Sequence, residues 1–159
     1  MLDIPRPTDI TQITDPQELK LIRAKIAAVA ALAKQAGTTR KDDWLLAFNA
    51  MKAFVISSIH AGKLWSEIED KRGPGQSDSA LPNWESAGFT SRNDAMVCQR
   101  LSWLDSEDIR VYFEDCLDNT RLPSVGGLYR IWQDYFGEPP EEDECVCYVC
   151  GNVHKRKTK

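Results

Sequence analysis

The sequence predicts an all-α fold: a long antiparallel helical hairpin, then several short helices, then a small C-terminal tail. Apolar residues recur at helical spacing over two long stretches, and residues that cap helices stand before several shorter ones. No stretch of useful length alternates apolar and polar residues as a half-buried strand does. We therefore expect a flexible arm over residues 1–14, the hairpin over 15–72, short helices over 73–136 in the same domain, and the tail over 137–159.

The first helix of the hairpin is expected to begin at Pro16. Asp15 can cap its free N–H groups, Pro16 suits the first turn, and Glu18 completes a capping box. Apolar residues then follow at spacings of three and four, which is one stripe of a helix. The stripe consists of Leu19, Ile22, Ile26, Val29 and Ala33. Gly37 is expected to end the helix.

The second helix is expected over roughly residues 41–71, as the central element of the core. Its apolar stripe again alternates spacings of three and four. The stripe consists of Ala47, Met51, Phe54, Ser58, Ala61, Trp65 and Ile68. The short connection over 37–40 makes the two helices an antiparallel pair, so we expect Met51 and Trp65 to be buried between them. His60 lies at the edge of the stripe and is interpreted as structural.

A segment rich in Gly, Pro and Ser over residues 72–79 separates the hairpin from the short helices. Thr90, Asp105 or Ser106, and Ser124 are the expected caps of three of these helices. The short helices are expected over 83–87, 91–101, 106–117 and 125–136.

The first two short helices, joined by a turn at Gly88, have the layout of a helix-turn-helix unit. In such a unit the second helix enters the major groove of DNA, where Arg can bond guanine and Asn or Gln can bond adenine. The candidate DNA-binding residues are Arg92, Asn93, Gln99 and Arg100. A helix–Gly–helix turn also occurs in many proteins that bind no nucleic acid, so the pattern alone does not decide the function.

Several segments resemble a helix-turn-helix-like module of uncharacterised phage proteins and of ParB-related DNA-binding proteins. The matching segments are 62–68, 87–91, 99–101, 105–115 and 124–132, scattered over about residues 20–133. The resemblance implies a phage- or plasmid-type DNA-binding regulatory protein. The chain departs from the module where the family has Ser-Ser-Arg-Trp, because Ala95-Met96-Val97-Cys98 stands there, and Asp94 follows Arg92 closely. If the inner arginine of the family contacts phosphate, that contact is lost here.

The charge distribution favours a different partner. The net charge is -4, and residues 73–136 hold 5 basic and 10 acidic side chains, whereas residues 1–72 hold 11 and 9. An acidic surface repels phosphate at long range. A protein-binding module that does not bind DNA is therefore the alternative function, for example a phage inhibitor of a host defence system that acts on a host or phage protein. A homodimer through the hairpin or the tail is also compatible with the sequence.

Three of the five cysteines and one of the two histidines cluster in the tail, at Cys145, Cys147, Cys150 and His154. Cys147 and Cys150 have the C-x-x-C spacing of a zinc knuckle, and Gly151 permits the tight turn behind them. With Cys145 and His154 the set reaches four ligands, so the tail is predicted to hold a structural Zn²⁺ with no open coordination position. The alternative is a disordered tail with free thiols.

The odd number of cysteines argues against a disulfide framework and favours a reducing, cytoplasmic compartment. Cys98 and Cys116 lie among apolar helical neighbours and are expected to be buried thiols. The apolar run 22–33 is shorter than the roughly 20 residues that a bilayer requires, so no membrane association is expected. There is no phosphate-binding Gly loop and no nucleophile elbow, so the chain is not expected to be an enzyme.

Overall fold

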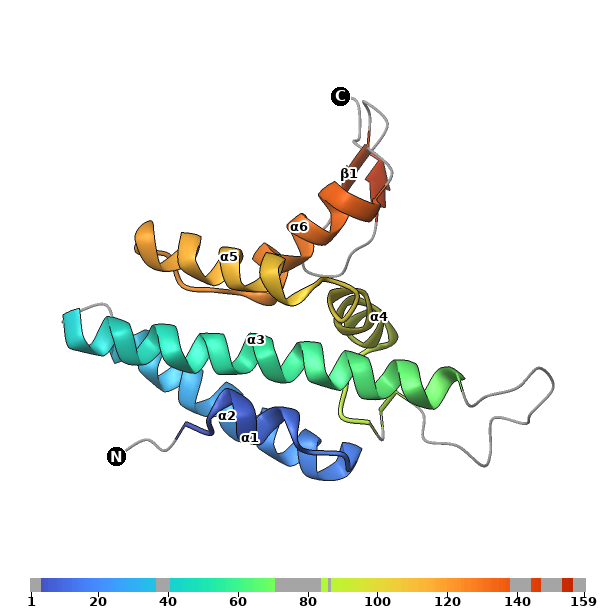
Figure 1. Ribbon diagram of the computed structural model, residues 1–159, viewed down its shortest axis with the longest axis horizontal. Helices are drawn as coiled ribbons and strands as arrows, with labels where there is room; N and C mark the ends of the chain where they lie inside the picture. Colours follow the sequence, from blue (N-terminus) through green and yellow to red (C-terminus); the bar gives the residue numbers. More distant parts are fainter. Residues whose placement is uncertain are drawn as a thin grey trace.

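The computed structural model describes residues 4–36, 41–70, 84–85, 87–137, 144–146 and 153–155. In these ranges the chain forms six helices and one short antiparallel ladder. The helices are α1 (Pro7–Thr11), α2 (Pro16–Ala36), α3 (Lys41–Asp70), α4 (Arg92–Leu101), α5 (Ser106–Asp118) and α6 (Val125–Phe136). Helix α3 runs through the middle, with α1 and α2 on one side of it and α4, α5 and α6 on the other (Figure 1). The predicted all-α class is confirmed for this helical body.

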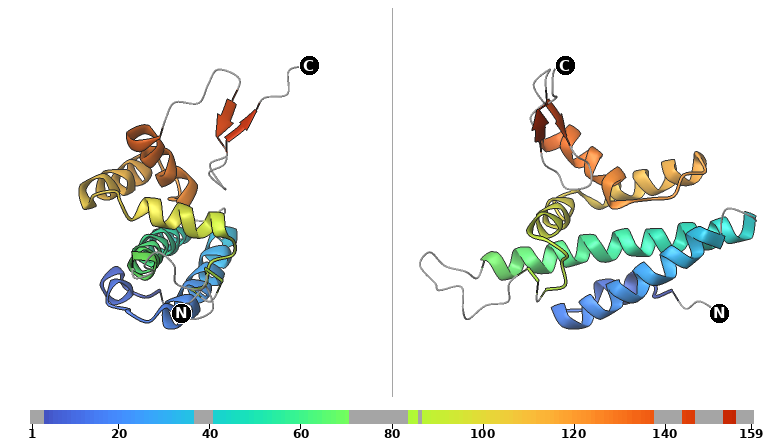
Figure 2. Two further views of the ribbon diagram at one scale, coloured as in Figure 1. Left: turned by 90° about the vertical axis from the view of Figure 1, so that its right-hand side faces the viewer. Right: turned by 180° about the vertical axis from the view of Figure 1, so that it is seen from behind.

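Helices α2 and α3 form the predicted antiparallel hairpin and lie side by side in every view (Figures 1 and 2). Helix α2 begins at Pro16 as predicted, where the carboxylate of Asp15 accepts the N–H of Gln17 at 3.1 Å. Small side chains allow the two helices to approach closely. The cluster between them contains Val29, Ala30, Ala33, Ala47 and Ala50. Trp65 is buried as predicted, whereas Met51 is only half-buried at the edge of this cluster.

The other side of α3 packs against the three short helices. This cluster contains Phe48 and Val55 of α3, Val97 and Leu101 of α4, Tyr112 and Phe113 of α5, and Leu128, Tyr129 and Trp132 of α6. Gly62 marks the point where α4 crosses α3, because a Cβ atom there would lie 1.9 Å from the carbonyl oxygen of Cys98. No larger residue fits this crossing without a shift of the backbone.

Burial on both sides also explains the apolar composition of α3. The stretch Asp43–Ile68, with mean hydropathy 1.3, is long and apolar enough to cross a membrane by length and composition. Half of its most apolar window is buried inside the protein, and the core helix of a soluble protein passes the same test. The sequence analysis had identified 22–33 as the most apolar run, so it missed this longer stretch.

The segment before α2 differs from the predicted flexible arm. Residues 7–11 form α1, Ile10 is fully buried and Ile13 nearly so, and both belong to one core cluster with α2 and α3. The ring Nε2 of His60 lies 2.6 Å from the carbonyl oxygen of Ile13, which gives His60 the structural role predicted for it. A helix of 5 residues is too short to produce a periodic pattern, and so the sequence did not reveal it.

The helix predicted over residues 83–87 is not present in the described residues of that segment. Residues 84 and 85, and then 87 and 88, form turns, with the N–H of Gly88 bonded to the carbonyl of Glu85 at 3.0 Å. Gly88 has φ +90, which favours glycine, and a Cβ atom there would lie 2.7 Å from the side chain of Lys20. A local turn that packs on α2 therefore takes the place of the first helix of the expected helix-turn-helix unit.

The tail contains the two strands β1 (Glu144–Val146) and β2 (Val153–Lys155), which pair in antiparallel register. Cα partners in this ladder are Glu144 with Lys155, Cys145 with His154, and Val146 with Val153. Each strand has 3 residues, too few for an alternating pattern to be recognised in the sequence.

Candidate functional site

Helix α4, the predicted DNA-reading helix, is capped by Ser91 and not by Thr90. The Ser91 hydroxyl accepts the N–H of Asp94 at 3.0 Å. In return, the Asp94 carboxylate accepts the N–H of Thr90 at 3.0 Å and the hydroxyl of Thr90 at 3.2 Å. The acidic residue beside Arg92 is therefore part of the cap that fixes the start of the helix.

Both long faces of α4 are occupied, because it lies between α3 and α6 (Figure 1). The buried side chains of α4 are Ala95, Val97, Cys98 and Leu101. Cys98 is fully buried, and this burial raises the pKa of its thiol to about 12, although nearby Arg23 acts in the opposite direction. Cys116 of α5 is fully buried too. The prediction of buried thiols at these two positions is confirmed.

The four predicted DNA-binding residues lie on α4 in different environments. Arg92 is exposed in the first turn, while Asn93 and Gln99 are half-buried. Arg100 is also half-buried: its Nη1 donates to the hydroxyl of Tyr129 at 2.6 Å, and its Cζ lies 4.8 Å from the ring centroid of Trp132. The Arg100 guanidinium therefore holds α6 against α4. Of these four residues, only Arg92 is fully exposed.

The turn between α4 and α5 places one tryptophan outside the core. The N–H of Trp103 bonds the carbonyl of Arg100 at 3.1 Å, and the N–H of Leu104 bonds that of Leu101 at 3.2 Å. This tight turn buries Leu101 and Leu104 and leaves Trp103 57% exposed. Asp105 follows and caps α5 by accepting the N–H of Asp108 at 2.8 Å, as the sequence predicted for this position or the next.

An aromatic row along α6 runs from the core to the surface next to Trp103. Tyr129 is fully buried and stacks on Trp132 at 5.4 Å between ring centroids, and Trp132 stacks on Phe136 at 5.8 Å. Trp103 packs on the same Trp132 ring at 6.0 Å. At the outer end Tyr135 is 64% and Phe136 55% exposed. We call Trp103, Trp132, Tyr135 and Phe136 the aromatic corner.

Three carboxylates stand at the aromatic corner. The hydroxyl of Tyr135 donates to Asp108 at 3.3 Å, Asp105 caps the same helix as Asp108, and Asp134 precedes Tyr135 on α6. The negative charge of Asp108 is the main cause that raises the pKa of the Tyr135 phenol, and Asp105 and Asp134 act in the same direction. Among the described residues, none of these three carboxylates forms an ion pair.

Two basic side chains near the aromatic corner bond other groups. Arg110 forms ion pairs with Glu107 and Glu114 on the surface of α5. Arg100 holds Tyr129 beneath the corner. The corner thus combines exposed aromatic rings with unneutralised negative charge.

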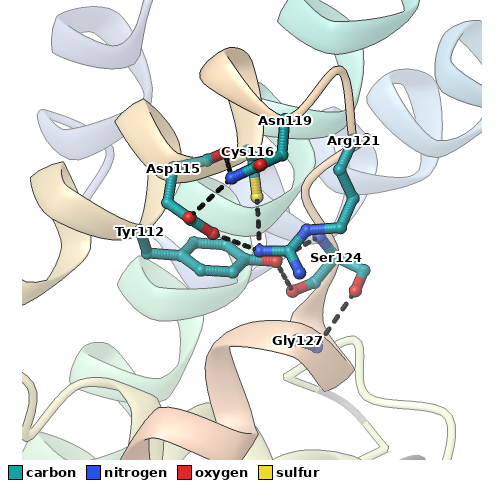
Figure 3. Close-up of polar contacts among 7 residues, drawn as sticks. All are labelled: Tyr112, Asp115, Cys116, Asn119, Arg121, Ser124 and Gly127. Carbon is teal, nitrogen blue, oxygen red and sulfur yellow. Dashed lines mark hydrogen bonds and ion pairs between the residues drawn. The ribbon is translucent and has the colours of Figure 1, made fainter.

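Hydrogen bonds among Tyr112, Ser124 and Gly127 hold the connection from α5 to α6 in place (Figure 3). The Tyr112 hydroxyl accepts the N–H of Ser124 at 2.9 Å and donates to the Ser124 carbonyl at 3.1 Å, while the Ser124 hydroxyl accepts the N–H of Gly127 at 3.0 Å. A Cβ atom at Gly127 would lie 2.4 Å from the Tyr112 hydroxyl, so the start of α6 packs closely against α5. Ser124 is the predicted cap of α6.

A pocket of about 640 Å³ lies beside this connection, lined by apolar side chains such as Val111 and Ile131 together with Arg121 and Arg130. Several of its polar groups bond one another. Arg121 forms an ion pair with Asp115 and contacts the Cys116 thiol, as Figure 3 shows. The polar side of the pocket is thus built as a brace for the α5–α6 turn.

Of the four predicted zinc ligands, the structure describes the backbone of Cys145 and His154 and places them directly opposite each other in the ladder. Residues that face each other across an antiparallel ladder lie on the same face of it. Cys147 and Cys150 lie outside the described residues. Over the part of the chain that is described, no group of three potential metal ligands occurs.

No protein-family model, curated protein or solved structure matches this chain. The resemblance to the phage and ParB-related module therefore stays a prediction.

Sequence reasoning missed the aromatic corner. No role was predicted for Trp103, Tyr135 or Phe136, although Trp132, Tyr135 and Phe136 continue at helical spacing to the very end of their helix. The sequence did contain a signal for this surface. The aromatic stripe of α6 continues to the last residue of the helix, and acidic residues follow it in the sequence.

Proposed function

We propose that this chain acts by binding another protein through the aromatic corner. The observation that carries the proposal is the cluster of three large aromatic side chains, Trp103, Tyr135 and Phe136, each more than half exposed. Trp103 and Phe136 both pack on Trp132, and Tyr135 packs on Phe136. Clustered exposed aromatic rings mark interaction sites, since Trp and Tyr contribute most of the binding energy at protein interfaces.

The corner is rigid, which favours its use as a binding surface. Trp132 is buried beneath the exposed rings, and the turn that carries Trp103 is closed by backbone hydrogen bonds. The free energy of binding is larger when the contacting side chains are ordered in advance, because less conformational entropy is lost.

DNA binding through α4 is the rival function, and the geometry of α4 supports it less well. Base reading requires side chains that extend from a protruding helix into a groove. Arg100 instead bonds Tyr129, and Arg92 stands beside the cap carboxylate Asp94. A DNA surface around Arg92 would also lack the local positive charge that phosphates require.

Site-specific photo-crosslinking in cells of the native organism tests the proposal. A photoreactive phenylalanine at position 103 should form discrete adducts that protease removes and nuclease does not. The same residue at position 21, where Leu21 of α2 is 72% exposed, is the matched control and should form none. Equal adducts at both positions, or none at position 103, would contradict the proposal. A shift of duplex DNA at low salt that Arg92→Ala abolishes would favour the rival.

We further propose that the tail holds one structural Zn²⁺ through Cys145, Cys147, Cys150 and His154. The pairing of Cys145 with His154 in the ladder supports this, because it brings two residues of suitable ligand type together from positions 9 apart in sequence. Thiolate and imidazole ligands in this number suit zinc.

Metal analysis of protein purified without chelator should give close to one zinc per chain. Cys147→Ser and Cys150→Ser should each lose it, while Cys116→Ser in the helical body should keep it. Absence of zinc from the unmodified chain would refute this proposal. Zinc retained only by a dimer would mean a site shared between two tails.

A further inference from the structure

The chemistry of the aromatic corner specifies the kind of partner segment that fits it. Its exposed rings present apolar edges and electron-rich faces, and the faces of Trp and Tyr attract cations. Carboxylates of Asp105, Asp108 and Asp134 lie around Tyr135, and none of them forms an ion pair among the described residues. A surface of this composition is complementary to positive charge flanked by apolar groups.

The sequence that follows the corner extends the same charge. Five acidic residues occur within 138–144, directly after α6 ends at Phe136. Acidic groups near an interface accelerate the encounter with a basic partner by attracting it from a distance, and they disfavour phosphate for the same reason. Charge complementarity therefore favours a basic protein segment over nucleic acid at this face.

We infer that the aromatic corner binds a segment of a partner protein that presents lysine or arginine side chains between apolar ones. This inference rests on the proposed function, because it names the partner chemistry of the same surface. A cationic head would lie over the faces of Trp103 and Tyr135 near the Asp108 and Asp134 carboxylates. The apolar neighbours of that cation would pack on Phe136.

Fluorescence anisotropy with a defined probe tests the inference on the full-length chain. The probe is a fluorescein-labelled amphipathic helical peptide of leucine and lysine, and its counterpart carries glutamate at every lysine position. The lysine peptide should bind and the glutamate peptide should not. Trp103→Ala and Tyr135→Ala should each weaken binding at least about tenfold, the size of effect seen at interface hot spots. Leu21→Ala, at an equally exposed apolar residue of α2, should leave binding unchanged.

A second pair of variants isolates the charge. Asp108→Asn combined with Asp134→Asn should weaken binding of the lysine peptide about three- to tenfold at low salt and less at high salt. Asp9→Asn, at an exposed carboxylate of α1, is the matched control. Equal binding of both peptides, or equal loss in Leu21→Ala and Trp103→Ala, would overturn the inference.

The chain contains a basic run of its own, since four of the last five residues, 155–159, are Lys or Arg. Replacement of these four by glutamine should leave the affinity for the lysine peptide unchanged. A large gain would mean that the chain's own end occupies the corner, and would overturn the assignment to a partner. If the peptides fail while crosslinks at position 103 persist, the cationic partner is wrong and the proposed function stands.

Discussion

The molecule contains two clusters of aromatic rings around an arginine, and they differ in how much of the cluster reaches solvent. In the inner cluster, Arg23 is buried with its Cζ 5.4 Å from the Phe89 ring centroid and 5.8 Å from that of Phe54. Trp65 packs edge-on against Phe89 at 6.0 Å and is buried as well. In the outer cluster, Arg100 lies over the buried Trp132.

The inner cluster serves stability, whereas the outer cluster, under the proposed function, would serve binding. The inner cluster is closed by α2, α3 and the Gly88 turn, so each of its aromatic contacts contributes to folding. In the outer cluster, the rings of Trp103 and Phe136 pack on Trp132 and are otherwise largely exposed. Trp103 and Phe136 should therefore add less to the stability of the chain than the buried rings, and more than half of each side chain stays exposed.

Truncation of Trp65 should destabilise the protein much more than truncation of Trp103. Trp65→Ala should lower the free energy of unfolding by about 3–5 kcal/mol, because a large buried ring leaves a cavity. Trp103→Ala should lower it by only about 1 kcal/mol, because the ring is more than half exposed and its aromatic contact is the one with Trp132. Chemical denaturation of both variants measures this. Similar losses of unfolding free energy in the two variants would show that Trp103 belongs to the core. The inner and outer clusters would then not differ as described.

A substitution at Gly62, where α4 crosses α3, should destabilise the protein nearly as much as Trp65→Ala. Gly62→Ala places a Cβ atom against the Cys98 carbonyl, which is backbone and cannot rotate away. The expected loss is about 3 kcal/mol, at the upper end for an overpacked core. Lys63→Ala, the exposed neighbour on α3, is the control and should be close to neutral. A neutral Gly62→Ala in a denaturant titration would mean that α4 does not pack on α3 as described.

The sequence was sufficient for the long elements. The bounds of α2, α3, α5 and α6 agree with the predictions to within about one residue, because stripes and caps are local signals. Segments with few residues were missed or misassigned: α1, the turn before Gly88 and the strand ladder each contain too few residues for a period to show.

The environment of α4 could not be predicted for another reason. A local pattern shows which residues are apolar but not which elements cover them. Arg100 bonds Tyr129, 29 positions away in the chain, and this contact depends on how α6 packs on α4. The aromatic corner likewise depends on the α4–α5 turn meeting the end of α6. The zinc ligands could be proposed from spacing alone, because a knuckle is a local motif.

Substitution of the two arginines of α4 should show which of them has a structural role. Arg100→Ala should lower the free energy of unfolding by about 1–2 kcal/mol, because it leaves the buried Tyr129 hydroxyl without its charged partner. Arg92→Ala, at the exposed start of the same helix, should have little effect. Thermal melts of the two variants provide the comparison. Equal melting temperatures would mean that Arg100 is available for a ligand, and would revive base reading by α4.

The smallest expected effect concerns the proton of Tyr135, and it reports directly on the negative charge of the corner. A phenolate at this position would lie beside Asp108, so the carboxylate disfavours ionisation and raises the phenol pKa above its ordinary value. Asp108→Asn removes the charge and should lower the Tyr135 pKa, whereas Asp9→Asn on α1 should leave it unchanged. NMR titration of ring-labelled tyrosine at alkaline pH resolves Tyr135, with Tyr135→Phe assigning its signal. If Asp108→Asn does not lower this pKa, the Asp108 carboxylate does not reach the exposed ring, and the corner loses the main charge that favours a cationic partner.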